Sequence, residues 1–440
     1  MTRNLLFFST LFLLLTSCNK KTIELPSVFL EEIDFVNTIG GSKNEVAKSV
    51  VFTNDGGYAI LGYVQSNDLD FSSKTNDSFD FFVIKYSQND VLEWIKTYGG
   101  SDDDRGDKII STSDGGFAVI GYSESSDIDV SENAGDKDFW ILKLDSNGNI
   151  TWKKTLGYLG KDFGTAIIET SDGGFLASGE LDVTASGGEG NTSSRPFHAG
   201  GDFWAIKLNY SGTVVWSRYY GGTFTETPSG IVETQNGNFI IAGTSDSADV
   251  DVLNNKGTYD FWVIKINSTG DLIWNKNFGG SEIDEAKAIV KTSNNNFLIL
   301  GNSRSNDQDI VQNSGGADLC IVKINDEGDL LMQKNLGGNN FDAGNAIHQM
   351  GDGNFLVSGS TRSTFGNIQN KGQNDAWLLK IDSQANILWQ KNIGGSNIDF
   401  CFDATELLDG TIIGVGESTS NDKDILENKG FSDILIVKLK

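Results

Sequence analysis

The chain has 440 residues, of which 52 are glycine and only 3 are proline. Its 34 Lys and Arg stand against 60 Asp and Glu, which gives a formal net charge of −26. A nucleic-acid partner requires a basic footprint, so this charge argues against nucleic acid. The negative charge is compatible with a role in solubility, in cation binding or in binding a basic partner.

The N-terminal segment has the pattern of an export signal. Arg3 precedes an apolar run that is too short to span a membrane comfortably, and the run ends in Leu15-Thr16-Ser17-Cys18. This ending resembles a bacterial lipobox, in which the cysteine is lipidated and becomes the mature N-terminus; the alternative is an ordinary signal peptide with an incidental cysteine. We expect residues 1–17 to be a lipoprotein signal peptide, Cys18 to carry the lipid, and residues 18–32 to form a tether. Contact with the membrane would then be through the lipid alone.

Residues 33–440 repeat one unit, which is clearest between Gly99 and Leu156. Two β-rich runs, KIIST and GFAVIGY, are joined by SDGG; a long polar loop leads to FWILKL, and an Asn-Gly turn leads to ITWKKTL. The pattern predicts a four-stranded antiparallel meander. The glycine that ends each fourth strand recurs every 57 to 64 residues, at Gly40, Gly99, Gly157, Gly221, Gly279, Gly337 and Gly394. Such a repeat predicts an all-β fold, a seven-bladed β-propeller.

The two ends of the repeated region indicate how the ring closes. The seventh unit stops after its third strand, SDILIVKLK, whereas IDFVNTIGG at the start matches a fourth strand that lacks the other three. We therefore expect the N-terminal strand to complete the last blade and close the ring. One domain spanning residues 33–440, monomeric in solution, follows from the unbroken repeat.

All nine tryptophans fall into two slots of the repeat, which we interpret as core positions rather than a sugar-stacking stripe. The third-strand slot holds Trp140, Trp204, Trp262 and Trp377, and the fourth-strand slot holds Trp94, Trp152, Trp216, Trp274 and Trp389. Cys320 occupies the third-strand slot of the fifth unit, so we expect it to be a buried packing residue and expect no disulfide.

Two acidic positions also recur in every unit. An Asp precedes each third strand, at Asp80, Asp138, Asp202, Asp260, Asp318, Asp375 and Asp433, and an acid lies five residues beyond each repeat glycine, at Glu45, Asp104, Asp162, Glu226, Asp284, Asp342 and Asp399. Seven copies of each predict hydrogen bonding at turns and strand ends rather than catalysis. As countercharges we expect Lys96, Lys154, Arg218, Lys276, Lys334 and Lys391, each two residues beyond the fourth-strand aromatic slot.

The long loops of five units carry Asp-x-Asp, at Asp68/Asp70, Asp127/Asp129, Asp249/Asp251, Asp307/Asp309 and Asp422/Asp424. Oxygen donors at alternate positions are compatible with Ca²⁺, although the third donor, glycine and distal glutamate of an EF-hand are missing. The alternative is that these aspartates order the loops through Asx-type turns. We predict no cofactor and no metal site, with calcium at these loops as the alternative.

Sequence motifs of enzymes are scarce. The chain has no Walker loop, no HExxH and no Gly-x-Ser-x-Gly, and His198 and His348 are its only histidines. His348 lies in an apolar first strand and is expected to be packed or to line the channel. No catalytic residue is predicted.

The repeat GG-x3-[Asp/Glu] … DGG[Phe/Tyr] … D[Phe/Tyr]W-x-x-K … W-x-K is similar to the propeller repeats of exported proteins and lipoproteins of Bacteroidota. The resemblance covers nearly all of the mature chain. It implies an outer-membrane or secreted location and a binding or scaffold role, and it supplies no catalytic residues. The stretch after Cys18, NKKTIEL, lacks an acidic run, so a periplasmic and a surface-facing orientation both stay open.

Two classes of function are compatible with the sequence. The first is a membrane-anchored lipoprotein that acts as a non-catalytic binding or scaffold module for an envelope protein or glycan. The second is a cell-envelope glycan hydrolase or lyase with its site at the mouth of the channel, which requires paired carboxylates that break the repeat; no such pair stands out.

The third unit departs most from the repeat, because its loop from about Leu181 to Gly201 makes it the longest. This loop contains a cation, an aromatic ring and an imidazole, and two flanking turns add a further cation and ring. The predicted ligand-binding residues are Arg195, Phe197, His198, Lys161 and Phe224. The alternative is an insertion without functional consequence.

Overall fold

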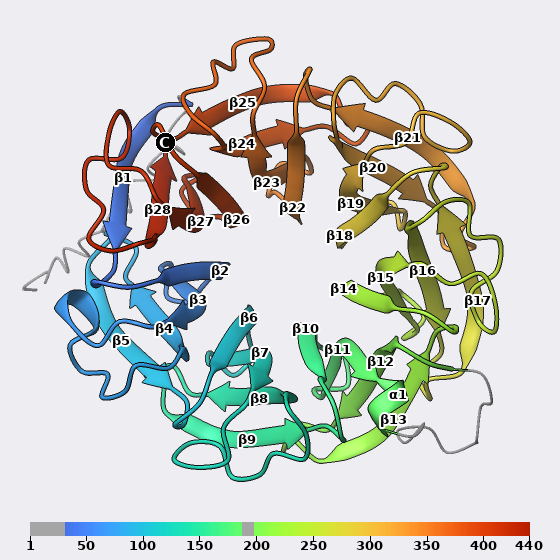
Figure 1. The fold of residues 1–440 in the computed structure, drawn as a ribbon, viewed down its shortest axis with the longest axis horizontal. Coiled ribbons are helices and arrows are strands. Elements are labelled where there is room, and N and C mark those ends of the chain that lie inside the picture. The colour runs from blue at the N-terminus through green and yellow to red at the C-terminus, as the bar shows by residue number, and fades with distance from the viewer. Residues whose placement is uncertain (1–30, 187–197) are drawn as a thin grey trace, which may run out of the picture.

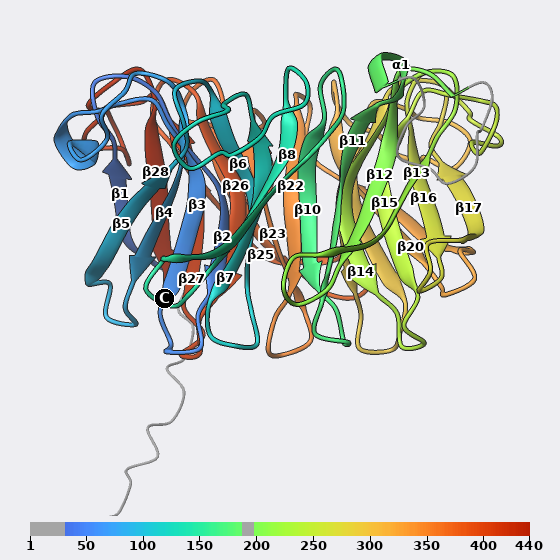
Figure 2. The ribbon, with the colours of Figure 1, turned by 90° about the horizontal axis from the view of Figure 1, so that it is seen from below.

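The computed structural model describes residues 31–186 and 198–440, which form a single ring of seven four-stranded antiparallel sheets (Figure 1). This confirms the predicted seven-bladed β-propeller. Figure 2 shows the long loops and α1 (Val183–Ser186) on one face, here called the upper face, and the C-terminus toward the opposite, lower face. The signal segment, Cys18 and nearly all of the tether lie outside the described residues. No helix within the described ranges is long and apolar enough to cross a membrane.

Each blade is a meander whose first strand is innermost and whose fourth strand is outermost (Figure 1). Blade 1 contains β2 (Glu45–Phe52), β3 (Tyr58–Val64), β4 (Asp80–Tyr86) and β5 (Leu92–Tyr98), with a short 3-10 helix η1 (Leu69–Phe71). Blade 2 contains β6 (Asp104–Ser111), β7 (Phe117–Ser123), β8 (Asp138–Leu144) and β9 (Ile150–Leu156). Blade 3 contains β10 (Phe163–Glu169), β11 (Phe175–Asp182), β12 (Gly201–Leu208) and β13 (Val214–Tyr220).

The remaining blades follow the same order. Blade 4 contains β14 (Glu226–Glu233), β15 (Phe239–Ser245), β16 (Asp260–Ile266) and β17 (Leu272–Phe278). Blade 5 contains β18 (Asp284–Lys291), β19 (Phe297–Ser303), β20 (Asp318–Ile324) and β21 (Leu330–Leu336). Blade 6 contains β22 (Asp342–Gln349), β23 (Phe355–Thr361), β24 (Asp375–Ile381) and β25 (Ile387–Ile393).

Blade 7 joins the two ends of the repeated region. It contains β26 (Asp399–Glu406), β27 (Ile412–Ser418), β28 (Asp433–Leu439) and, as its outermost strand, β1 (Ile33–Ile39). β1 pairs antiparallel with β28, and the backbones of Glu32 and Lys440 exchange hydrogen bonds of 3.0 and 3.1 Å. The N-terminal strand thus closes the ring, as the sequence predicts.

The turn between the first and second strands explains two recurring residues of the unit. In blade 2, Thr112 Oγ1 and the Gly116 amide donate to Asp114 at 2.6 and 3.0 Å, and the third-strand Lys143 Nζ lies 2.8 Å from the same carboxylate. Burial alone would raise the pKa of Asp114, but these donors lower it to about 2. The lysine of each D[Phe/Tyr]W-x-x-K run is therefore a structural cation that fixes a lower turn.

The third-strand tryptophan slot belongs to the core, as predicted, whereas four of the five fourth-strand tryptophans are only half-buried and pack against the core from the outer wall. The third-strand residues Trp140, Trp262 and Trp377 are fully buried, and Trp140 packs edge-on against Phe81 of the preceding blade at 4.7 Å. The fourth-strand tryptophans Trp94, Trp152, Trp216 and Trp274 contact the lower turn of the next blade. Cys320 is fully buried, and burial raises its pKa to about 12, so it is a packing residue and not a reactive thiol.

The recurring acids order turns on the upper face, as predicted, but their expected countercharges are wrong. Asp104 is fully buried and accepts hydrogen bonds from Ser123, from the Gly100 amide at 2.7 Å and from Ser125 at 2.9 Å. Lys96 instead reaches Asn149 in the lower turn of the next blade at 2.8 Å, and Lys334 reaches Asn386 in the same way at 2.7 Å. These lysines point across to the neighbouring blade's lower turn, while the acids lie at the other end of the strands.

Candidate functional site in the central channel

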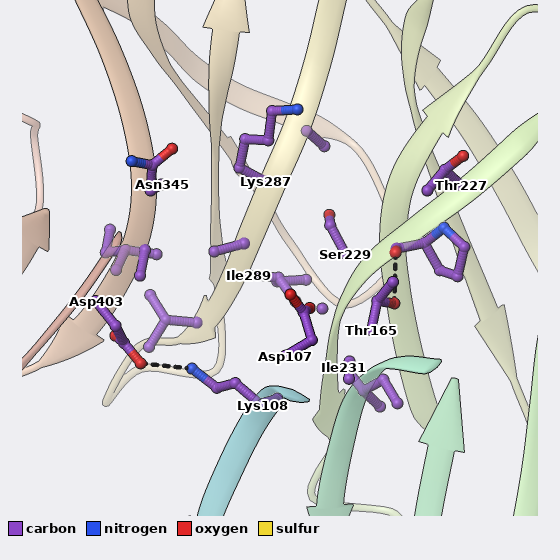
Figure 3. A pocket seen from close by; sticks show the side chains of 18 of the residues that line it. Asp107, Lys108, Thr165, Thr227, Ser229, Ile231, Lys287, Ile289, Asn345 and Asp403 are labelled. Carbon is purple, nitrogen blue, oxygen red and sulfur yellow. Dashed lines mark hydrogen bonds and ion pairs between the residues drawn. The ribbon is translucent and has the colours of Figure 1, made fainter. Parts of the chain in front are cut away.

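A cavity of about 680 Å³ lies on the ring axis and is lined by residues of the innermost strands (Figure 3). Each of these seven strands has a register shift at the same place, where one extra residue is left unpaired. The bulged residues all line the cavity and are Lys48, Asp107, Thr165, Ser229, Lys287, Asn345 and Phe402. The bulge therefore directs one variable side chain from every blade into the channel.

The residue that follows the bulge is small in five blades, where it is Ser49, Ala166, Gly230, Ala288 or Ala346. The other two blades carry Lys108 and Asp403 at this position. Two residues further along, five blades have Val or Ile and blade 7 has Thr405, whereas blade 6 has His348. Lys108, Asp403 and His348 are thus three departures from the repeat on strands β6, β26 and β22.

The three departures meet in the structure. Asp403 Oδ1 lies 2.6 Å from His348 Nε2, and Asp403 Oδ2 lies 3.0 Å from Lys108 Nζ (Figure 3 shows the lysine contact). Ser49 Oγ and the Val50 amide of blade 1 also donate to Asp403 Oδ2, at 2.8 and 3.2 Å. Blades 6, 7, 1 and 2 therefore converge on one carboxylate.

The three residues of this cluster differ in burial and in charge. The Asp403 side chain is 1% exposed, whereas those of Lys108 and His348 are 30% and 39% exposed. Burial alone would raise the pKa of Asp403, but Lys108 and His348 hold it well below its usual range. Asp403 is therefore an ionised, fully hydrogen-bonded anchor, and it presents a cation and an imidazole to the channel.

The rest of the channel wall combines polar groups with an apolar surface. Lys48 lies 3.4 Å from Asp107 and 4.7 Å from the centre of the Phe402 ring, and Lys287 pairs with Glu285 at 3.1 Å. Hydroxyl and amide groups come from Thr165, Ser229, Thr227 and Asn345, and aliphatic side chains come from Ile110, Ile168, Val232 and Val290. This lining suits a ligand with many hydrogen-bonding groups and some apolar surface.

The sequence predicted that His348 is packed or lines the channel, and the structure places it on the channel wall; Lys108 and Asp403 were missed. An alignment of the seven first strands contains the signal, because both residues replace small side chains. The pairing itself joins residues 295 positions apart and depends on ring closure, so no local pattern reveals it.

The predicted patch beside the third-blade loop is only partly within the described residues, because Arg195 and Phe197 lie outside them. Lys161 and Phe224 are exposed, the latter by 59%. Their turns flank the loop as expected: Gly160 lies against Ala185, and the Ala199 amide donates to the Gly222 carbonyl at 3.1 Å.

His198 does not contribute an exposed imidazole to this patch. Its side chain is 1% exposed, its Nδ1 contacts Asp202, and its ring packs edge-on against Tyr219 at 5.1 Å. In other blades the residue four positions before the third-strand Asp donates its backbone amide to that carboxylate, as Ala134 does to Asp138 at 2.7 Å. In blade 3 the His198 ring contacts the same carboxylate and is buried, so it is a structural residue and not the exposed ligand contact that the sequence predicted.

The Asp-x-Asp loops hold the turns between blades. Asp127 Oδ1 accepts from the Ser101 amide at 2.8 Å, and Asp129 Oδ2 accepts from the Gly99 amide at 3.4 Å. The other four loops make the same pair of contacts. These bonds support the loop-ordering interpretation, and residues 31–186 and 198–440 contain no group of three or more His, Cys, Asp or Glu that could hold a metal ion.

No protein-family model and no curated protein matches the chain. Among solved structures it is similar to the Neurospora crassa Pan2 WD40 domain, with 10% identity, 91% of this chain and 95% of that chain covered, and a TM-score of 0.48. BBS1N in complex with ARL6DN shares 10% identity, with 94% and 97% covered and a TM-score of 0.47. A fungal alcohol oxidase of the AA5 family in complex with copper shares 11%, with 93% and 76% covered and a TM-score of 0.49. At these identities the likenesses concern the fold alone and carry no argument about function.

Proposed function

We propose that this protein is a non-catalytic binding module that admits part of a glycan or polypeptide ligand into its central channel. One observation carries the proposal: the three departures from the repeat in the innermost strands converge on Asp403 and place Lys108 and His348 on the channel wall. At the equivalent positions most of the other blades carry small or aliphatic residues.

The state of the carboxylates favours binding over glycan hydrolysis. A glycoside hydrolase uses one carboxyl group as a proton donor and a second as base or nucleophile. In this channel Asp403 is ionised and committed to several donors, and Asp107 is paired with Lys48. Asp104, whose pKa burial raises to about 6, is fully buried in a turn between blades and lies away from the channel. Burial also raises the pKa of Glu180, which accepts from the channel residue Thr227, and of Glu417 beside Lys48, but neither of these two acids lines the cavity.

A channel-blocking variant tests the proposal. Ligands would be identified with a glycan array and a pull-down from cell-envelope extract, and their affinities measured for Ser229→Trp, which places an indole in the channel. The control is Thr151→Trp on an exposed outer strand. We expect at least a tenfold loss of affinity for Ser229→Trp and none for the control, together with recovery of the ligand uncleaved. Equal affinities would move the site to a loop face, and cleavage of a bound glycan would favour the hydrolase or lyase.

The exposed Lys161 and Phe224 beside the third-blade loop are a second candidate contact region. They present a cation and an aromatic ring on the upper face of an acidic protein. If the channel-blocking variant keeps its affinity, Phe224→Ser is the next variant to measure, and a tenfold loss there would assign binding to this region.

We further propose that the protein is a bacterial lipoprotein of the outer membrane, anchored through Cys18. The proposal is supported by the lipobox-like sequence Leu15-Thr16-Ser17-Cys18 after a short apolar run. Because the Cys18 thiol is the only acceptor for the lipid, Cys18→Ser is expected to leave the protein unprocessed or released from membranes. A processed, acylated Cys18→Ser protein that still sediments with membranes would contradict the lipid anchor.

A further inference from the structure

The contacts between successive blades follow one design on the outer wall of the ring. The fourth-strand tryptophan of one blade lies over the lower turn of the next, and Trp94 approaches both Gly148 and the Phe117 ring, the latter at 6.3 Å. The indole N–H donates to a turn carbonyl in three such contacts: Trp152 to Tyr210, Trp216 to Ser268 and Trp274 to Asp326, at 2.9 to 3.2 Å. The Lys or Arg two residues later lies across the same turn. An indole and a cation therefore cover each of these turns.

The contact between blade 7 and blade 1 breaks this design at five positions. Phe35 replaces the tryptophan, Asn37 replaces the basic residue, and Asp90 replaces the turn residue that is Gly or Ala in blades 2 to 6. Tyr58 replaces a residue that is Phe in those blades, and Tyr86 replaces a Leu or Ile. All five residues line a cavity of about 300 Å³, here called the seam cavity.

Asp90 shows that the missing indole and the new carboxylate are linked. Its φ of 58° is in the left-handed region, as is the φ of 73° at Gly148 in the next blade. A Cβ on Gly148 would lie 2.8 Å from Trp94, so the indole excludes a side chain there. At the seam cavity the smaller Phe35 removes this conflict, and a carboxylate occupies the turn.

The seam cavity combines aromatic walls with an acidic group. The Tyr58 and Tyr86 rings stack with their centres 5.0 Å apart, and Tyr58 donates to Asp90 Oδ1 at 3.2 Å. Lys438 Nζ contacts Asp90 Oδ2 at 2.7 Å, while the carboxylate keeps 28% of its side chain exposed. Aromatic faces and a carboxylate attract planar rings and cations, and the net charge of −26 opposes anions.

We propose that the seam cavity binds a planar aromatic ring that carries a positive charge, of the kind an indole with an ammonium group presents. Four of the other contacts between blades define this chemistry, because there the chain itself supplies an indole, from Trp94, Trp152, Trp216 or Trp274, and a basic residue two positions later. The proposal goes beyond channel binding, since β1 lies on the outer wall of the ring (Figure 1).

Two ligands that share a ring and differ in charge test the proposal. Tryptamine carries an ammonium group and indole-3-acetate a carboxylate, and their binding to the full-length protein can be followed by ligand-observed NMR. We expect saturable binding of tryptamine at least tenfold tighter than that of indole-3-acetate. The Asp90→Asn variant should reduce this preference by at least threefold. Absence of saturable tryptamine binding, or equal binding of the two ligands, would overturn the proposal.

A variant that restores the common design locates the site. Phe35→Trp supplies the indole from the chain and is expected to abolish tryptamine binding. Met332→Trp combined with Ala385→Gly is the matched control, because it adds an indole at the other fourth strand that lacks one and removes the Cβ that the indole would meet. It should leave binding unchanged. Should Phe35→Trp fail to fold, Tyr86→Leu, which restores the aliphatic residue of the other blades, decides in its place. Unchanged tryptamine affinity in the folded variant would overturn the assignment.

Discussion

Two kinds of buried carboxylate occur in this ring, and their pKa values are shifted in opposite directions. Asp104 belongs to a set of acids that recurs in every blade; it accepts only neutral donors, and burial raises its pKa to about 6. Asp403 occurs once, is equally buried, and is held ionised by Lys108 and His348. An aspartate therefore orders a turn between blades where its donors are neutral, and it anchors a charged cluster where a lysine and a histidine contact it.

The cluster at Asp403 depends on a closed ring, because its hydrogen-bond donors come from blades on both sides of the closure. Deleting residues 19–39 removes β1 and leaves β28 with an unpaired edge. We expect the truncated protein to open or aggregate, which size-exclusion chromatography and thermal unfolding would detect. A truncated protein as monomeric and as stable as the full body would contradict closure by β1.

Replacing each carboxylate by the corresponding amide should cost a different amount of folding stability at the two kinds of site. Asp403→Asn leaves Lys108 without its partner and puts an NH2 group where a carboxylate oxygen accepted hydrogen bonds, so we expect a loss of about 2 kcal/mol in unfolding free energy at pH 7. Asp104→Asn removes a charge that burial disfavours; its oxygen can still accept from the Gly100 amide and Ser125, and its NH2 group can donate to Ser123 Oγ, so its cost should stay below about 1 kcal/mol. Urea unfolding measures both variants. Equal costs would remove the distinction between the two sites.

The recurring acids also predict how stability changes with pH. Burial raises the pKa of Asp104 to about 6 and that of Asp260 to about 7, and the same direction holds for Asp80, Asp162, Glu226 and Asp318. Between about pH 4 and pH 7 the folded protein therefore holds more protons than the unfolded chain, and stability falls as the pH rises. The depressed pKa of Asp403 acts below this window, where stability is lost as the pH falls.

We accordingly expect the midpoint of thermal unfolding to be several degrees higher at pH 5 than at pH 7.5. The Asp104→Asn variant should show a smaller difference, because it removes one of the groups that binds a proton on folding. A midpoint that rises steadily from pH 5 to pH 7.5 would show that these acids are ionised in the folded protein.

The smallest expected effect concerns the third-blade loop. The buried His198 ring contacts Asp202, so His198→Ala removes this contact and should cost about 1 kcal/mol of stability. Its effect on ligand affinity should be small, since the side chain is buried. An unchanged stability with weakened binding would return His198 to the list of ligand contacts.

The fold could be predicted from the sequence because the same four-stranded unit recurs seven times. Strand order, the closing strand and both tryptophan slots follow from comparing units, so an error in one unit is corrected by six others. The basic residue after Trp94 was paired with the wrong partner because a strand position does not tell which end of the neighbouring blade a long side chain reaches. The cluster at Asp403 was missed because it occurs once and its members come together only when the ring closes.

The two histidines of the chain allow ligand entry into the channel to be tested directly. His348 lines the channel, whereas His198 is buried beside Asp202 in blade 3. In protein labelled at histidine and lacking an affinity tag, a ligand identified by pull-down or array should shift the NMR signals of His348 and leave those of His198 unchanged. Binding that leaves His348 unchanged, or that shifts His198 alone, would contradict the account.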